Sequence, residues 1–143
     1  DVERSRGLGD VYKRQNDTCQ RAEPFSQLDD LRQPLQALLA RVSEVTLGLL
    51  GDLQQGHVNA ALADSALYLK AFGHLVLGWR WLEQAVRAEQ GRLAGNGADT
   101  DFYDGKLQAA RYFMLREVPG CHHDLDILAR RDDTCLAMQD AWF

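Results

Sequence analysis

Apolar positions from Pro34 onward recur every three or four residues, a pattern that predicts amphipathic helices. The first long helix is expected to begin near Pro34, because proline fits the first turn of a helix, and to stop at Gly56. The S-x-x-D pattern of Ser26 and Asp29 predicts a short capped turn before it. The apolar face of this helix consists of Leu35, Leu38, Val42, Val45, Leu49 and Leu53.

A second long helix is expected to start at Asn59 or to restart at Ser65, since both residues are good N-caps. It should run to about Gln90, where the glycine that follows can end it. Gly73 and Gly78 inside it are explained either by the close approach of a neighbouring helix or by tolerance of glycine in a well-packed core. Its middle is apolar nearly all round, which indicates a central helix or one that meets a second subunit. The main stripe is Leu69, Phe72, Val76, Trp79, Leu82 and Val86, widened by Leu75, Leu77 and Trp81.

A third helix is expected to begin at the cap residues of positions 99–101 and to be broken or kinked at Pro119 and Gly120. A continuation and a last short helix, capped within positions 132–134, should complete the chain. No stretch of useful length alternates as a strand would. The pattern therefore predicts an all-α, up-and-down bundle of three long helices plus short helices. The apolar positions of the third helix and its continuation are Phe102, Leu107, Ala110, Phe113, Met114, Leu125 and Leu128.

The first fifteen residues, DVERSRGLGDVYKRQ, show neither helical nor strand periodicity. They hold four basic and three acidic residues, whereas the whole chain has a net charge of −5. Their ending, GDVYKRQ, resembles translated sequencing-adapter read-through, and a flexible native tail is the alternative. We favour a foreign segment, which implies that the chain begins within a longer reading frame. The predicted division is 1–15 as a non-native or disordered tail, 16–33 as a short helical lead-in and 34–143 as the main domain.

The composition is that of one globular domain, with 143 residues, 45% apolar and 26% charged. Basic residues are scattered among acidic ones, which disfavours a nucleic-acid partner because such binding needs clustered Lys and Arg. The longest apolar run, residues 71–79, lies between Lys70 and Arg80 and contains His74. A bilayer span needs about 20 apolar residues, so this run indicates a buried helix and no membrane span is expected.

Three cysteines, Cys19, Cys121 and Cys135, are an odd number without CxxC spacing. This pattern favours reduced thiols in a cytoplasmic protein. No secretory signal pattern is recognised ahead of the fold.

The densest group of possible metal ligands is Cys121-His122-His123-Asp124, with Asp126 close by. Neighbouring helix residues point in different directions, so only His122 and Asp126 should share a face. No second cluster completes a tetrahedral site. A solvated polar surface near a helix kink is the favoured interpretation.

His74 faintly resembles the H-x-x-K-G helix of histidine phosphotransfer domains, but Leu77 replaces the lysine. A packed histidine with a satisfied hydrogen bond is favoured. Glu83 and Glu117 are possible bases without a visible partner to shift their pKa values. We therefore predict no catalytic, cofactor-binding or metal-binding residue in this chain. Six aromatic residues at helical spacing, which favour core or interface over a ligand pocket, are Trp79, Trp81, Phe102, Tyr103, Tyr112 and Phe113.

Three stretches carry a family resemblance: YLKAFGHLVLGWRWL at 68–82, DFYDGKLQAARYF at 101–113 and DDTCLAMQDAWF at 132–143. They resemble the extra carboxy-terminal helical domain of acyl-CoA dehydrogenases in the branch similar to 3-methylmercaptopropionyl-CoA dehydrogenase. The likeness covers most of residues 35–143, and the ending resembles a natural carboxy terminus. These are packing motifs, so they indicate a domain family and not a chemistry.

The resemblance implies a parent enzyme that binds FAD and oxidises an acyl-CoA to a trans-2-enoyl-CoA. A glutamate base would take the α-proton while hydride passes to the flavin. In this family that glutamate and most FAD and CoA contacts lie upstream, so the fragment alone should be inactive. Its implied partners are the catalytic core of the same chain and further subunits of a homo-oligomer. The alternative is a free-standing, non-catalytic helical dimerisation or interaction module.

Overall fold

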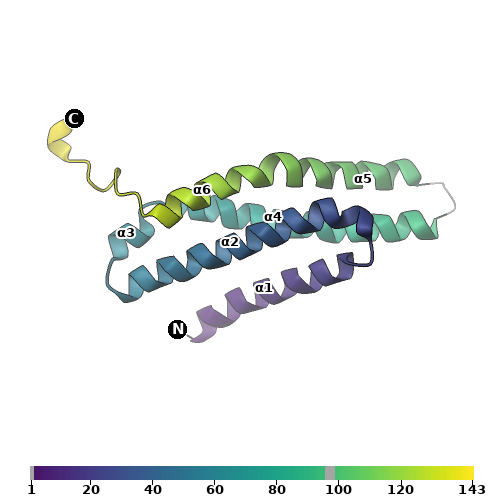
Figure 1. Ribbon diagram of the computed structural model, residues 1–143, viewed down its shortest axis with the longest axis horizontal. Coiled ribbons are helices and arrows are strands. Elements are labelled where there is room, and N and C mark those ends of the chain that lie inside the picture. The colour runs from purple at the N-terminus through teal and green to yellow at the C-terminus, as the bar shows by residue number, and fades with distance from the viewer. Residues whose placement is uncertain (1, 96–98) are drawn as a thin grey trace.

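The computed structural model describes residues 2–95 and 99–143, with side chains from residue 13 onward. Within these ranges the chain is helical and has no strand, which confirms the predicted all-α bundle (Figure 1). The long elements are α1 (Val2–Ala22), α2 (Asp29–Gln54), α4 (Ser65–Ala94) and the joined pair α5 (Thr100–Tyr112) and α6 (Val118–Arg130).

The amino-terminal helix α1 runs without a break from Val2 to Ala22, across the predicted boundary between tail and lead-in. The predicted division of the chain stays a prediction. Apolar periodicity is hard to recognise there, since few residues before position 15 are apolar. Among the described side chains of α1, Gln15, Thr18, Cys19 and Ala22 are buried. The foreign origin of residues 1–15 stays a prediction.

Helix α2 begins at Asp29 and not near Pro34, which corrects the predicted start. A short 3₁₀ turn, η1 (Ser26–Leu28), leads directly into it. Leu28 and Leu31 are fully buried on either side of this junction. Their burial offsets the one backbone hydrogen bond that a proline inside a helix removes.

Helices begin close to both predicted starts, the short α3 (Val58–Leu62) and α4, but their N-caps are His57 and Asp64 and not the predicted Asn59 and Ser65. The predicted stop after α2 is also confirmed, because Gly56 has a φ of +85° that favours glycine. Helix α4, however, runs past Gly91 to Ala94. A Cβ at Gly91 would lie 2.5 Å from Cζ of Tyr103, so this glycine makes room for a packed ring and does not end the helix.

The third helix begins at Thr100, as predicted, and does not break at Pro119. A π-helical segment, η2 (Phe113–Glu117), joins α5 to α6, and the N–H of Val118 donates to the carbonyl of Phe113. Proline lacks the N–H that a regular helix needs, and the wider turn just before it absorbs this defect.

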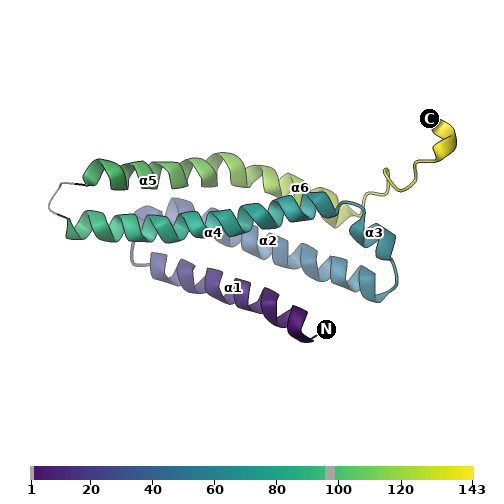
Figure 2. The same ribbon diagram turned by 180° about the vertical axis from the view of Figure 1, so that it is seen from behind.

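No α-helix follows Arg131 in the described chain, so the predicted last short helix is wrong. Residues 132–143, here called the tail, hold only a turn and the 3₁₀ helix η3 (Asp140–Trp142). Every residue of the tail is exposed, and it extends away from the bundle in both views (Figures 1 and 2). Without a core to cover an apolar face, a short helix has little to stabilise it.

Helix α4 is the centre of the bundle, because it packs against α1, α2, α5 and α6. This confirms the expected central helix. No helix in the described ranges has the length and apolar character needed to cross a membrane. The most completely buried apolar side chains are Leu28, Leu31, Leu35, Leu38, Val42, Leu75, Leu82, Met114, Val118 and Leu125.

Candidate functional site

The seam between α4 and the π-helical segment gathers several residues that the sequence marked as candidates. Nδ1 of His74 lies 3.0 Å from the carbonyl oxygen of Lys70 and donates to it. The imidazole stacks on Phe113 with 5.7 Å between ring centroids. Nε2 lies 3.9 Å from Oε2 of Glu117. His74 is therefore a packed histidine with a backbone hydrogen bond, as the sequence favoured, and not an exposed phosphate acceptor.

A second pair crosses the same seam one turn further along. Nζ of Lys70 lies 2.8 Å from Oδ2 of Asp124, whose side chain is 10% exposed. The hydrogen bond to Asp124 raises the pKa of Lys70. Burial raises the pKa of the neighbouring Cys121 thiol, so at neutral pH this sulfur is protonated and a poor nucleophile. The pair ties α4 to α6 and leaves no activated group.

The other members of the polar cluster point away from this seam. Oδ1 of Asp126 accepts from Nη2 of Arg41 on α2 at 2.7 Å, and His123 is exposed. Across the described part of the chain, no three His, Cys, Asp or Glu side chains are placed to hold one metal ion. The structure thus divides this cluster among two helix contacts and the solvent.

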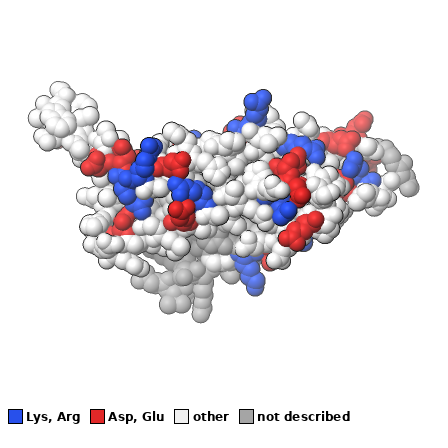
Figure 3. All heavy atoms as spheres, viewed as in Figure 1, with Lys and Arg blue, Asp and Glu red and all other residues white. Residues whose placement is uncertain are grey.

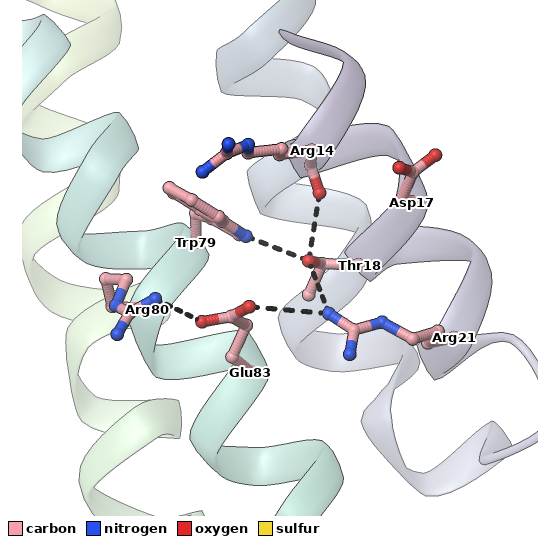
Figure 4. A pocket seen from close by; sticks show the side chains of 7 residues that line it. All are labelled: Arg14, Asp17, Thr18, Arg21, Trp79, Arg80 and Glu83. Atoms are coloured by element: carbon pink, nitrogen blue, oxygen red, sulfur yellow. Dashed lines mark hydrogen bonds and ion pairs between the residues drawn. The ribbon is translucent and has the colours of Figure 1, made fainter. Parts of the chain in front are cut away.

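A pocket of about 420 Å³ opens between α1 and α4 (Figure 4). Trp79 donates its indole N–H to Oγ1 of Thr18 at 2.8 Å, and Thr18 donates to the carbonyl of Arg14 at 3.0 Å. The sequence did not identify Thr18, because one threonine in a polar segment carries no signal of its own. The residues that line the pocket are Arg14, Asp17, Thr18, Arg21, Trp79, Arg80 and Glu83.

Glu83 forms ion pairs with two of the arginines that line this pocket. Glu83 accepts from Arg80 at 2.6 Å and from Arg21 at 3.4 Å, one cation from each helix. Each carboxylate oxygen of Glu83 accepts from one guanidinium group, Oε1 from Arg21 and Oε2 from Arg80. The arrangement therefore fastens α1 to α4 and does not present a general base.

The most deeply buried charge in the described chain was not predicted. Glu89 is fully buried on α4 and accepts from Nη2 of Arg92 at 2.8 Å and from the side-chain amide of Gln27. The hydrogen bond from Arg92 lowers the pKa of Glu89 against the opposing effect of burial. In the sequence this glutamate is one of five charged residues between positions 80 and 92, so only the fold could reveal its burial.

The aromatic residues do not line a common pocket. Tyr103 packs against α4, Trp79 faces α1 and Phe113 stacks on His74. Phe102 and Tyr112 are 62% and 60% exposed. The predicted core position is confirmed for Trp79, Trp81, Tyr103 and Phe113, which pack partly buried against the core, although Trp79 also lines the pocket between α1 and α4. It is wrong for the exposed Phe102 and Tyr112, and a place at an interface stays a prediction for these two.

The fold and its polar contacts define a helical packing domain in which most of the described ion pairs join segments far apart in the sequence. The chain belongs to the acetyl-CoA dehydrogenase C-terminal like family, whose sequence profile matches residues 11–139. This confirms the resemblance to an acyl-CoA dehydrogenase carboxy-terminal domain, while the narrower branch stays a prediction. No curated protein matches the chain.

Proposed function

We propose that this chain is the carboxy-terminal helical domain of a cytoplasmic, FAD-dependent acyl-CoA dehydrogenase. The parent enzyme would oxidise an acyl-CoA to a trans-2-enoyl-CoA, and this domain would pack on the catalytic core and contribute to subunit contacts. The observation that carries the proposal is the family match over residues 11–139. The polar contacts support it, since several of them, such as Lys70 with Asp124 and Arg21 with Glu83, join one helix to another.

The described residues do not fit a flavin. In the pocket between α1 and α4, Arg21 and Arg80 are paired with Glu83, and the carboxylates of Asp17 and Glu83 in the lining disfavour a pyrophosphate by like-charge repulsion. We therefore place FAD and the catalytic glutamate in the part of the parent that precedes this domain. No reaction step is assigned to this chain.

The test is a comparison of the parent enzyme with and without residues 35–143. Flavin content and acyl-CoA-dependent dye reduction are measured on both purified proteins. We expect the truncated enzyme to lose flavin retention or subunit assembly, because the domain would support the core. A truncated enzyme that keeps full flavin and activity would contradict a structural role.

A free-standing dimerisation module is the second candidate, and the apolar side chains left exposed on the bundle favour it. The genomic sequence upstream of Asn16 separates the two. An open frame encoding an acyl-CoA dehydrogenase core supports the enzyme domain, and a start codon near Asn16 supports the module.

A further inference from the structure

The outward face of the helix formed by α5 and η2 is not covered by any other element in the described part of the chain. Helix α5 packs mainly against α4 and forms an outer edge of the bundle in both views (Figures 1 and 2). Along this edge exposed positions recur every three or four residues. These positions, which we call the α5 face, are Asp101, Phe102, Gly105, Gln108, Tyr112, Leu115 and Arg116.

Three large apolar side chains on the α5 face are left in solvent. Phe102 is 62% exposed, Tyr112 is 60% exposed and Leu115 is 57% exposed. Burying them at a contact is favourable in proportion to the apolar area that is removed from water. The α5 face therefore has the apolar part of a contact surface, and its charges and its glycine identify the partner.

The two ends of the α5 face carry opposite charges. Asp101 lies at its start and Arg116 near its end, and neither forms an ion pair with another described residue. Glu117, next to Arg116, lies instead 3.9 Å from Nε2 of His74. Figure 3 shows acidic groups at the end of the bundle where α5 begins and basic groups further along it. Such a face complements a second copy of itself that runs antiparallel, because each carboxylate then meets a guanidinium group.

The same antiparallel arrangement matches the other side chains of the α5 face. A two-fold axis between Gln108 and Ala109 sets each residue against the one that lies equally far beyond the axis. Opposite charges, apolar side chains, and a large and a small residue then face each other. The three pairs are Asp101 with the partner's Arg116, Phe102 with the partner's Leu115, and Gly105 with the partner's Tyr112.

Gly105 supports this register because no contact within the described chain explains it. Glycine destabilises a helix interior relative to alanine, and a Cβ at Gly105 would meet no described atom within 4 Å. The chain already uses a glycine to receive a tyrosine ring, since a Cβ at Gly91 would lie 2.5 Å from Cζ of Tyr103. In the antiparallel pair, the surface at Gly105 would receive the ring of the partner's Tyr112 in the same way.

We propose that the α5 face is the contact between two copies of this chain, which pair as antiparallel helices about a two-fold axis between Gln108 and Ala109. The inference specifies the subunit contacts of the proposed function, and its place in the parent enzyme rests on that function. The pairing itself belongs to the isolated chain. A contact of one helix from each copy buries less than about 1,200 Å² in total, which is typical of weak complexes.

Sedimentation velocity of the isolated chain measures the pairing. Between about 5 and 500 µM we expect a shift from monomer to dimer, with a dissociation constant on the order of 100 µM. Asp101→Arg and Arg116→Asp should each weaken the dimer at least about tenfold, because each sets like charges against each other twice in one dimer. The double variant should return to within about threefold of the wild type. A chain that stays monomeric, or a double variant as weak as the single ones, would overturn the proposal.

Two glycine variants test the packing of the α5 face. Gly105→Gln fills the space that the partner's Tyr112 needs, so it should abolish the dimer over the same concentrations. Gly51→Gln is the matched control, because Gly51 lies on the last turn of α2 and a Cβ there also meets no described atom within 4 Å. It should leave the dissociation constant unchanged. A dimer that survives Gly105→Gln uses another face and contradicts the inference.

A disulfide locates the axis. The background variant is Cys135→Ser, since the other two cysteines are buried. Gln108→Cys places a thiol next to the axis, and Gln33→Cys places one on the exposed side of α2. Mild oxidation should join two copies at least about tenfold faster through Gln108→Cys, because a disulfide needs Cα atoms less than about 7 Å apart. Equal rates would show that the axis lies elsewhere.

The same thiol separates the possible occupants in the parent enzyme. Gln108→Cys should form a disulfide between two parent subunits. A thiol that is shielded from a maleimide but forms no disulfide would show that the catalytic core covers the α5 face, which would overturn the pairing. A parent without flavin or acyl-CoA oxidation would instead reject the proposed function, and the result on the isolated chain would still decide the pairing.

Discussion

Gln15 on α1 shows most clearly how a single side chain bears on the stability of this bundle. It is fully buried, yet neither amide atom of its side chain has a hydrogen-bond partner. Its neighbours on the same face of α1, Thr18 and Cys19, fit their places, the first through hydrogen bonds and the second as a small apolar group. An unsatisfied amide at the end of the segment predicted to be foreign is what a mismatched sequence would leave.

Replacing Gln15 by Leu should therefore stabilise the chain. Removing an unsatisfied buried polar group recovers about 1–3 kcal/mol, and the added apolar burial acts in the same direction. Urea denaturation followed by tryptophan fluorescence measures the change. The control is Gln20→Leu on the exposed face of the same helix, which should change the free energy of unfolding little. A loss of stability in Gln15→Leu would show that this amide is satisfied by solvent.

Glu89 gives the chain a defined response to acid. Its pKa is lowered in the folded state, so its contribution is fully present above the ordinary value of 4.5 and is lost as pH falls through the folded value. Glu89→Gln should unfold more easily than the wild type at pH 7, by about 1–3 kcal/mol.

The difference in unfolding temperature between Glu89→Gln and the wild type should shrink as the pH falls below 4.5, because the carboxylate of the unfolded chain then takes up a proton before that of the folded chain does. Thermal unfolding from pH 7 to pH 3 measures it. Glu44→Gln is the matched control, since its ion pair with Arg41 is at the surface and its carboxylate side chain is 69% exposed. A constant difference across this range would contradict the assignment.

At the scale of elements, the sequence predicted which segments are helical better than where they begin and end. Stops set by backbone geometry were correct, as at Gly56, which adopts positive φ. Boundaries that depend on tertiary packing were not. Helix α2 extends before Pro34 because Leu28 and Leu31 are buried by other helices, and α4 passes Gly91 because Tyr103 packs over it. Periodicity within one segment cannot contain this information.

The glycines of α4 separate the two explanations that the sequence left open. A Cβ at Gly78 would lie 3.0 Å from Cδ1 of Leu35, whereas a Cβ at Gly73 would have no neighbour within 4 Å. Gly73→Ala should stabilise the helix by up to about 1 kcal/mol through helix propensity. Gly78→Ala should gain less or lose stability, because Leu35 and its neighbours must shift. Chemical denaturation of both variants measures this, and equal gains would contradict close packing at Gly78.

For the whole molecule, the class of fold followed from the apolar pattern and the family from three packing motifs. The polar contacts did not follow, because they join residues far apart in the sequence, such as Lys70 with Asp124 and Trp79 with Thr18. A candidate list drawn from residue types alone named His74 and Asp124 but not Lys70, Thr18 or Glu89. The prediction that the chain carries no catalytic residue remains open to test on the parent enzyme.

The isolated chain should bind a dye specific for exposed apolar surface. Large apolar side chains are exposed on the end of α2, on α3 and at the start of α4, among them Leu47, Leu62 and Leu69. Leu62→Glu should lower the fluorescence of the bound dye more than Leu93→Glu, because more exposed apolar residues lie on the elements next to Leu62 than on those next to Leu93. Negligible dye binding by a folded monomer would contradict an apolar contact surface there.

The point where the tail leaves the bundle is set by Arg131, which ends α6 with a φ of 54°. Its guanidinium reaches across to Asp52 on α2 and lies over Gly48, where a side chain would collide with it. An ion pair between side chains that are 25–28% exposed therefore holds a backbone geometry that usually belongs to glycine. Added salt weakens such a pair. Although most of the tail is uncharged, the direction in which it leaves the bundle should therefore depend on ionic strength through the ion pair of Arg131 with Asp52.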